Sequence, residues 1–185
     1  MEIFKTSNPI EAIVYAAECL KPDGHEGLDV FFNKSTFLQT GTIDTSDRKA
    51  AKDLGIPVWE AQHMGGSIVC FDGDLSLCMT SNGENDFGER LFEATKKFLI
   101  NRGIDTIGNN NDILADGKKV MSWARGIINT GWVQTVAHFS VNIDLDLIMR
   151  LCTKPMEKTP GALSVYGITA EELYNEVVEP LLKGV

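Results

Sequence analysis

Five stretches of the chain have the pattern of apolar and polar residues that is typical of helices. The longest runs from Asp86 to Arg102, where the apolar side chains fall mostly on one face, and Gly103 ends it. The first begins at Asn8-Pro9-Ile10-Glu11, in which a capping residue precedes a proline suited to the first helical turn. The other three cover residues 45–54, 145–151 and 169–182.

Short apolar runs between these stretches are typical of β-strands. They lie at residues 28–33, 36–40, 56–60, 68–71, 75–79 and 104–107, with three more runs between residues 109 and 141. We expect the run at 75–79 to return beside the run at 68–71 across the Asp72-Gly73-Asp74 turn. Meandering strands interrupted by helices indicate an α+β fold with a mixed, mainly antiparallel sheet flanked by helices. We expect a single domain over residues 1–185.

The segment from Asn109 to Val141 contains the strongest local signal in the chain. Asp116-Gly117 between two runs of β-type residues predicts a tight hairpin, so Lys118 and Lys119 stand at the start of a strand. Neighbouring strand residues project to opposite faces, so one lysine of the pair can enter a cleft, and the pattern that follows favours Lys119. The same two lysines also fit an ordinary solvated hairpin.

A glycine pair, Gly65 and Gly66, opens through Ser67 directly into the strand at 68–71. Two residues without side chains let backbone N–H groups face an anionic or planar ligand. A β-bulge or a loop fits the pair equally well. Under the functional interpretation, we expect these residues and Lys119 to face each other across one cleft.

Composition narrows the classes of partner. The 185 residues include 17 basic and 26 acidic ones, and the formal net charge of −9 argues against binding to nucleic acid or to an anionic membrane. No apolar run reaches the length of a membrane span. The four cysteines are typical of free thiols in the cytoplasm, although Cys70 and Cys78 can face each other across the expected hairpin. Three scattered histidines predict no metal site of the protein's own, and we expect a monomer.

The order and spacing of these motifs resemble the lipoate–protein ligase family, within the biotin/lipoyl ligase superfamily, from about Asn8 to about Leu151. Five segments carry the resemblance: Asn8-Pro9 with its helix, Val30–Gly41, Met64–Asp72, Asn111–Val120 and Val136–Val141. About one helix follows Leu151, so the resemblance implies the catalytic domain without a C-terminal accessory domain.

The resemblance assigns roles to individual residues. The catalytic lysine of the family stands directly before an isoleucine or valine, a position that Lys119 occupies here. The residues implied to bind substrate or nucleotide are Gly65, Gly66, Ser67, Asn111, Asp112, Ser122 and His138.

The chain departs from the family pattern at three places. Ala61, Gln62 and His63 stand where the family has arginines that hold the phosphate of the acyl-adenylate, which removes a fixed positive charge. Ala137 replaces the first of two family histidines. Trp123 is bulky at a position where we expect it to crowd the pocket.

The reaction implied by the resemblance has two steps. Lipoate or octanoate attacks ATP to give an acyl-adenylate, and the acyl group then passes to a lysine of a lipoyl-carrier domain, from a 2-oxoacid dehydrogenase or a glycine cleavage H-protein. A lysine at a strand start suits the carboxylate and the bridging phosphate. Asn111 and Asp112 suit adenine or a Mg²⁺ that arrives with ATP. The strands at 68–71 and 120–123 are expected to wall a tunnel for the acyl chain.

Three alternatives stay open at this point. A catalytically impaired protein that binds an acyl group or a nucleotide is consistent with the absent arginines. An ATP-independent lipoyl or octanoyl transferase needs an activated cysteine, yet no cysteine lies between Gly117 and Val141. A biotin ligase belongs to the same superfamily.

Overall fold

The computed structural model describes residues 1–19, 24–40, 45–60, 66–83, 85–129 and 131–184. The strands of these residues form a seven-stranded sheet in the order β1-β2-β6-β10-β9-β8-β7 and a three-stranded sheet in the order β4-β3-β5. The large sheet consists of β1 (Glu2–Thr6), β2 (Gly27–Phe32), β6 (Leu75–Asn82), β10 (Trp132–Phe139), β9 (Lys118–Asn129), β8 (Asp112–Ala115) and β7 (Thr106–Asn109). The small sheet consists of β4 (Val58–Glu60), β3 (Phe37–Thr40) and β5 (Ile68–Cys70).

Both sheets are mixed. β1 runs parallel to β2, and every other pair in the large sheet is antiparallel. In the small sheet β4 is parallel to β3 and β5 is antiparallel to it. The predicted α+β class, with a mainly antiparallel sheet, is therefore confirmed. β1 is an addition, because the sequence analysis assigned no strand before the first helix.

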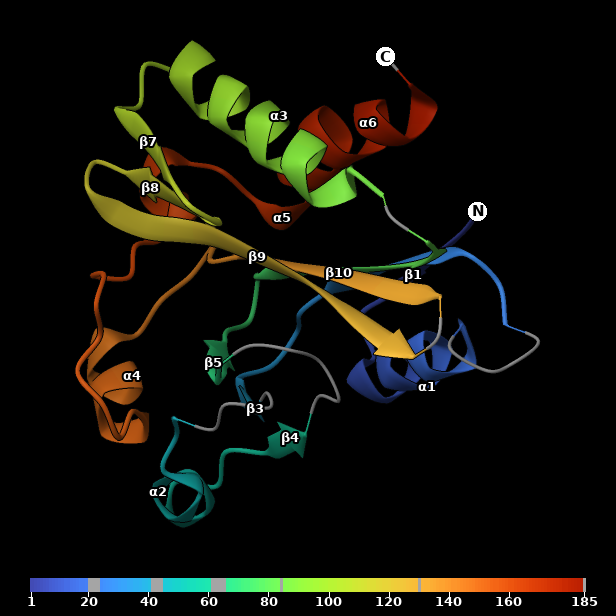
Figure 1. Cartoon of the computed structure of the whole chain (residues 1–185). Coiled ribbons are helices and arrows are strands. Elements are labelled where there is room, and N and C mark those ends of the chain that lie inside the picture. Colours follow the sequence, from blue (N-terminus) through green and yellow to red (C-terminus); the bar gives the residue numbers. More distant parts are fainter. Residues whose placement is uncertain (20–23, 41–44, 61–65, 84, 130, 185) are drawn as a thin grey trace.

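Helices cover the large sheet on both faces (Figure 1). α3 and the C-terminal helices lie on one face, while α1, the small sheet, α2 and α4 lie on the other. The helices are α1 (Pro9–Cys19), α2 (Arg48–Asp53), α3 (Phe87–Asn101), α4 (Leu145–Leu151), η1 (Leu163–Tyr166), α5 (Ala170–Leu173), η2 (Tyr174–Val178) and α6 (Glu179–Lys183).

The main core fills the space between the large sheet and α3 with the C-terminal helices. Leu91 and Leu99 of α3 are fully buried, as the predicted apolar face requires, and they pack with Leu28 and Phe139 of the sheet and Val178 of η2. Burying a side chain of this size stabilises the fold by about 1.5–3 kcal/mol. A second, smaller cluster, which includes Leu38, Val69 and Leu151, ties the small sheet to α2 and α4. A third cluster, with Phe31 of β2, Phe37 of β3 and Cys70 of β5, joins this layer to the large sheet.

One predicted helix begins later than expected, and another is not a regular α-helix along its whole length. α2 begins later than expected because Asp47 caps it, accepting a hydrogen bond from Ala50 N at 2.9 Å. The last predicted helix is present as α5, a π-helical turn and α6 in succession, and it begins at the predicted cap, where Thr169 Oγ1 accepts from Glu172 N at 3.1 Å. None of the helices in the described part of the chain has the length and apolarity needed to cross a membrane.

The expected pairing of the runs at 68–71 and 75–79 is wrong, because β5 belongs to the small sheet and β6 to the large one. The turn between them is present, and Gly73 has a φ of 92°. Cys70 and Cys78 therefore lie in different sheets, and all four cysteines are free thiols. β2 and β3 likewise belong to different sheets.

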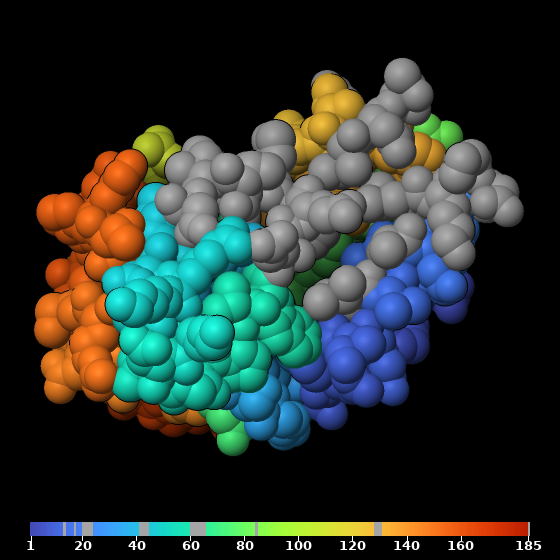
Figure 2. Space-filling view, turned by 90° about the horizontal axis from the view of Figure 1, so that it is seen from below, coloured from blue at the N-terminus to red at the C-terminus, as the bar shows by residue number. Residues whose placement is uncertain are grey.

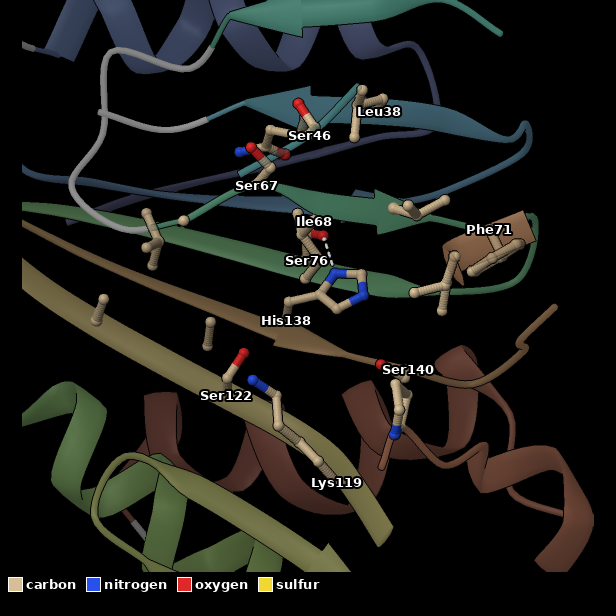
Figure 3. Close-up of a pocket in the computed structure, with 18 of the residues that line it drawn as sticks. Leu38, Ser46, Ser67, Ile68, Phe71, Ser76, Lys119, Ser122, His138 and Ser140 are labelled. Atoms are coloured by element: carbon tan, nitrogen blue, oxygen red, sulfur yellow. Dashed lines mark hydrogen bonds between the residues drawn. The ribbon is translucent and has the colours of Figure 1, made fainter. Parts of the chain in front are cut away.

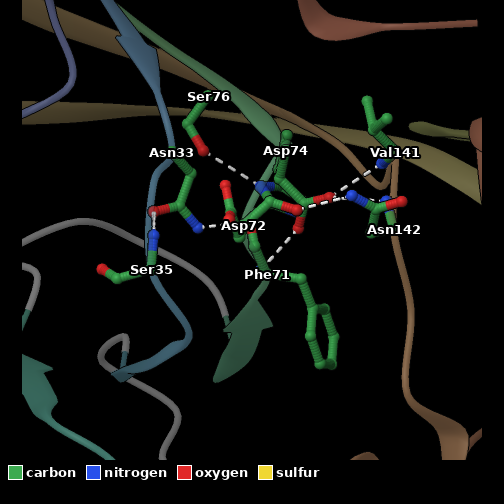
Figure 4. Close-up of polar contacts among 9 residues, drawn as sticks. Asn33, Ser35, Phe71, Asp72, Asp74, Ser76, Val141 and Asn142 are labelled. Atoms are coloured by element: carbon green, nitrogen blue, oxygen red, sulfur yellow. Dashed lines mark hydrogen bonds and ion pairs between the residues drawn. The ribbon is translucent and has the colours of Figure 1, made fainter.

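Buried Asp74 fixes the passage of the chain from one sheet to the other (Figure 4). One carboxylate oxygen accepts hydrogen bonds from Val141 N at 2.8 Å and Asn142 N at 3.0 Å, and the other accepts from Phe71 N at 2.8 Å. A buried carboxylate is stable when several backbone N–H groups satisfy it. Asn33 Nδ2 also donates to Phe71 O at 2.6 Å, so β2, β5 and the end of β10 meet at this turn.

Candidate functional site

A cavity of about 860 Å³ lies between the large sheet and the layer below it. Its roof is one face of the large sheet, formed by β2, β6, β10, β9 and the start of β8, and its other walls are α1, the small sheet and the segment after α4. Figure 2 shows the molecule from below, where α4 in orange, α2 in cyan and α1 in blue follow one another across the surface. The side chains of the candidate site face this cavity in Figure 3.

A row of polar residues crosses the roof on four neighbouring strands. Ser76 of β6 pairs in register with His138 of β10, His138 with Ser122 of β9, and Ser122 with Asp112 of β8. All four line the cavity. Residues in register on antiparallel strands stand side by side on one face, so the sheet itself lines up these polar groups.

Lys119 reaches this row because of a β-bulge. Ile113 pairs with Met121 whereas Leu114 pairs with Lys119, so Val120 is an extra residue in β9. Val120 and Met121 are both buried in the main core, and Lys119 emerges on the same face as Ser122. Lys119 lines the cavity, whereas Lys118 is exposed outside it.

Lys119 is held through both its backbone and its ammonium group. Its N–H donates to Thr159 O and its carbonyl accepts from Gly161 N, both at 2.8 Å. Its Nζ lies 3.3 Å from Asp112 Oδ1, and the other oxygen of Asp112 lies 2.5 Å from Lys158 Nζ. Two ammonium groups therefore share one carboxylate at the wall of the cavity. This leaves one positive charge in excess for an anionic ligand.

Gly66 and Ser67 line the cavity across from Lys119, so the predicted cleft is present for these residues (Figure 3). Ser67 Oγ accepts a hydrogen bond from Thr45 N at 3.2 Å. Gly65 lies outside the described residues, as do Ala61, Gln62, His63 and Met64.

His138 is buried between two polar partners. Its Nδ1 lies 3.0 Å from Ser76 Oγ, and its Nε2 lies 3.4 Å from Asp74 Oδ2 without forming a hydrogen bond of good geometry. The same Asp74 carboxylate holds the crossing between the sheets. The orientation of His138 is thereby tied to the joint between the two layers.

One expectation about the site requires correction. Asn111 is exposed and is not among the residues that line the cavity; its carbonyl accepts a hydrogen bond from Trp123 N at 3.0 Å. Trp123 itself lines the cavity, and its ring also lies over Gly88 of α3, where a Cβ would collide with it. Ile68, Val69 and Phe71 line the cavity as predicted, whereas Val120 and Met121 belong to the core.

The thiols near the cavity are poorly suited to nucleophilic catalysis. Cys152, at the end of α4, and Cys78, on β6, both line it. Burial raises the pKa of each thiol above its ordinary value, and it also raises the pKa of Cys70. Because the thiolate is the reactive form, a raised pKa disfavours attack at neutral pH.

The sequence analysis missed several residues of the cavity. Lys154 and Lys158 line it from the segment after α4, which has no regular pattern that marks it. Asp29 lines it from β2, where it stands alone between the buried Leu28 and Val30. An acidic residue inside an apolar strand was a readable signal, because such residues are rarely buried without a reason. Among the described residues, no group of three or more histidine, cysteine or acidic side chains is arranged to hold a metal.

No protein-family profile and no curated protein sequence matches the chain. Solved structures match its fold. The putative lipoate protein ligase Ta0514 from Thermoplasma acidophilum, with bound lipoic acid, gives a TM-score of 0.73 at 17% identity, covering 96% of this chain and 82% of that one. Lipoate-protein ligase A bound with ATP gives 0.73 at 18% identity, with coverages of 96% and 82%.

An archaeal bipartite lipoate protein ligase, described with its E2 lipoyl domain from Thermoplasma acidophilum, gives a TM-score of 0.70 at 18% identity, with coverages of 97% and 82%. Biotin protein ligases from Aquifex aeolicus give lower scores, 0.53 and 0.52. The predicted resemblance to lipoate–protein ligases is thus confirmed at the level of the fold.

Proposed function

We propose that this protein is a lipoate–protein ligase-like enzyme, in which Lys119 is the catalytic residue. It activates lipoate or octanoate with ATP to an acyl-adenylate and transfers the acyl group to a lysine of a carrier domain. The observation that carries the proposal is the position of Lys119. In a fold shared with lipoate–protein ligases, its ammonium lies in the same cavity as Gly66 and Ser67.

The cavity is lined by both kinds of side chain that such a ligand needs. Lys119, Lys154 and Lys158 line it, and such cations can receive a carboxylate and the phosphate attacked by it. Preorganised charges of this kind stabilise the negative charge that accumulates during adenylate formation. Ile68, Phe71 and other apolar side chains line the rest, which suits an aliphatic chain.

The cavity also fits the Mg²⁺ that accompanies ATP. Magnesium bound to a nucleotide needs one or two protein carboxylates and otherwise keeps waters and phosphate oxygens as ligands. Asp112 and Glu157 line the cavity and can supply them. When bound, the ion would neutralise phosphate charge, and the residues of the chain would orient the reacting groups.

The proposed acceptor is a lysine of a lipoyl domain or of a glycine cleavage H-protein. The description of an archaeal ligase together with its E2 lipoyl domain supports this class of acceptor. The reaction consumes ATP, so we place it in the cytoplasm. A single domain suffices for the activation step, because all residues invoked here lie on one cavity.

Calorimetry and a turnover assay on the same preparation test the proposal. We expect lipoate and octanoate to bind and, with ATP and Mg²⁺, to yield pyrophosphate and an acyl-adenylate. Addition of a lipoyl domain should then give an acylated domain, measured by mass spectrometry. Binding without pyrophosphate release would contradict the ligase and support the alternative of a catalytically impaired binding protein, which the replacement at residues 61–63 favours.

Cys152 provides the test against acyl transfer through a cysteine. Its thiol lines the cavity, but its raised pKa disfavours the thiolate. We expect Cys152→Ser to retain the wild-type rate of acyl transfer from lipoate and ATP. Transfer from an acyl thioester that depends on this thiol and proceeds without ATP, with release of the donor thiol, would replace the ligase by a transferase.

A further inference from the structure

The cavity ends in a buried carboxyl group that none of the chemistry above uses. Asp29 is 5% exposed and lines the cavity, and its Oδ1 has no hydrogen-bond partner among the described residues. Native proteins rarely bury a polar atom unpaired, and an exception calls for an explanation. A ligand group that completes the hydrogen bonding is one such explanation.

Asp29 stands at the end of a second row across the roof. It pairs in register with Cys78, Cys78 with Val136, and Val136 with Ala124, and all four line the cavity. On β6, β10 and β9 the residues of this row stand two positions along the strand from those of the polar row, so they face the same side of the sheet. Apart from Asp29, its members are apolar or carry a neutral thiol, so it suits an acyl chain.

The two charged ends of the cavity are far apart. Asp112, which holds the ammonium of Lys119, is on β8, and Asp29 is on β2, four strand spacings away. Four spacings correspond to about 19 Å between backbones. A chain whose carboxylate lies at Lys119 therefore points its far end toward Asp29.

The described residues around Asp29 supply no charged partner for its carboxyl group. Across the cavity α1 presents the small side chains of Ala12 and Ala16. The titratable groups close enough to interact with Asp29 are Tyr15, Cys19 and Cys78, and burial raises the pKa of each of them, so all three are neutral at pH 7. No cation of the described residues pairs with this carboxyl.

We propose that Asp29 selects an acyl substrate whose far end donates a hydrogen bond, over a plain alkyl chain. The chemistry required is a carboxylic acid with an O–H or N–H group at the opposite end, as in an ω-hydroxy acid or in the ureido ring of biotin. This inference rests on the proposed function, because the direction of the chain is set by Lys119.

Burial of this carboxyl also affects its own charge. The pKa of Asp29 is raised to about 7 by desolvation. An acceptor with such a pKa is largely ionised in slightly alkaline solution, where it binds a donor most strongly. The binding measurements below are therefore made at pH 8.

The experiment compares four acids by calorimetry: octanoate, 8-hydroxyoctanoate, lipoate and biotin. A hydrogen bond to a charged group predicts that 8-hydroxyoctanoate binds the wild type about tenfold or more tightly than octanoate. Asp29→Leu should abolish this ratio, and Asp29→Asn should reduce it. Asp105→Asn, which makes the same change of charge at an exposed site, should leave it unchanged. Comparing biotin with lipoate tests a ureido N–H as the donor, and comparing 8-hydroxyoctanoate with octanoate tests a hydroxyl.

Each outcome decides the inference. Equal affinity for octanoate and the hydroxy acid, or a preference that survives in both Asp29 variants, overturns it. If octanoate is activated by ATP as fast as any donor-bearing acid, the ligase proposal is supported and the role of Asp29 is contradicted. If donor-bearing acids bind through Asp29 but no adenylate forms, the role of Asp29 stands and the ligase falls. If none of the four acids binds, both are wrong.

Discussion

At the scale of single residues, the two adjacent lysines after the hairpin turn differ in environment although they are chemically identical. Lys119 lies in the cavity beside Asp112, whereas Lys118 is exposed outside it. A compact ammonium in a partly enclosed site interacts with a ligand charge far more strongly than one in water. Only the first position can therefore contribute substantially to stabilising charge during a reaction.

Replacing Lys119 tests this difference. We expect Lys119→Ala to fold and to lose about 10²–10³-fold in the rate of acyl-adenylate formation, the effect of losing one preorganised donor. Lys118→Ala is the matched control and should stay within about threefold of wild type, because surface changes have small effects. Pyrophosphate release from lipoate and ATP is the measurement. A wild-type rate for Lys119→Ala would remove it from the catalytic role.

Asp29 gives a pH dependence of stability with an unusual sign. Its pKa is raised from 3.8 to about 7 in the folded protein. Between these values the folded state binds a proton that the unfolded state has lost, so the free energy of unfolding falls as the pH rises from about 4 to about 7. The loss of stability over this range is on the order of 4 kcal/mol.

We expect Asp29→Asn to remove this slope and to be more stable than wild type at pH 8. Urea unfolding at a series of pH values measures the free energy of unfolding of both proteins. The difference between the two curves removes the contribution of the carboxylates that both proteins share. Parallel curves for the two proteins would show that Asp29 is not protonated by burial.

At the scale of elements, the start of β9 depends on a segment that is distant in sequence. Residues 159–161 lie alongside it and satisfy both backbone groups of Lys119. The contact is close, since a Cβ on Gly161 would lie 2.7 Å from Lys118 Cβ. The hairpin turn that joins β8 to β9 has the backbone conformation of a type I′ turn. Asp116 and Gly117 have φ values of 48° and 74°, both positive as this turn requires.

Gly161→Val is therefore expected to displace this segment from β9. Overpacking of this kind costs about 1–3 kcal/mol in the free energy of unfolding, and we expect adenylate formation to fall as Lys119 moves. Thr159→Val provides the control, because its side chain is exposed and only its carbonyl is used. An unchanged rate and stability for Gly161→Val would mean that the segment does not position the lysine.

At the scale of the whole molecule, the Asp74 turn is one of the places where the two layers around the cavity are joined. Asp74 accepts three backbone N–H groups from both sides of the joint, and it lies next to His138 of the polar row. A hydrophobic cluster of Ala12, Phe31, Phe37 and Cys70 joins β2 to α1 and the small sheet as well, so the turn and this cluster both hold the layers in place.

We expect Asp74→Ala to lower the free energy of unfolding by about 3 kcal/mol or more, since each buried N–H left without an acceptor costs about 1–3 kcal/mol. Asp72→Ala, in the same turn but exposed, should change it by less than about 0.5 kcal/mol. Denaturant unfolding of both variants is the measurement. Equal stability of the two variants would contradict the role given to Asp74.

The local structure could be predicted well wherever a short signal was sufficient. The cap at Asn8, the apolar face of α3 and the Asp116-Gly117 turn each involve residues within one turn or one helix. The pairing of distant strands could not be predicted in the same way. β5 and β6 are separated by a four-residue turn and still belong to different sheets, because the turn is fixed by hydrogen bonds from β2 and β10.

The sequence by itself therefore determined the fold class, the helices, the hairpin and the segments that carry the site. Only the tertiary structure decided which side chains meet. The bulge at Val120 places Lys119 on the same face as Ser122, so that both line the cavity. The unpaired oxygen of Asp29 and the contact of Lys158 with Asp112 likewise depend on segments far apart in the chain. The physical reason is that burial and register are properties of the assembled sheet, whereas propensity and turn chemistry act over a few residues.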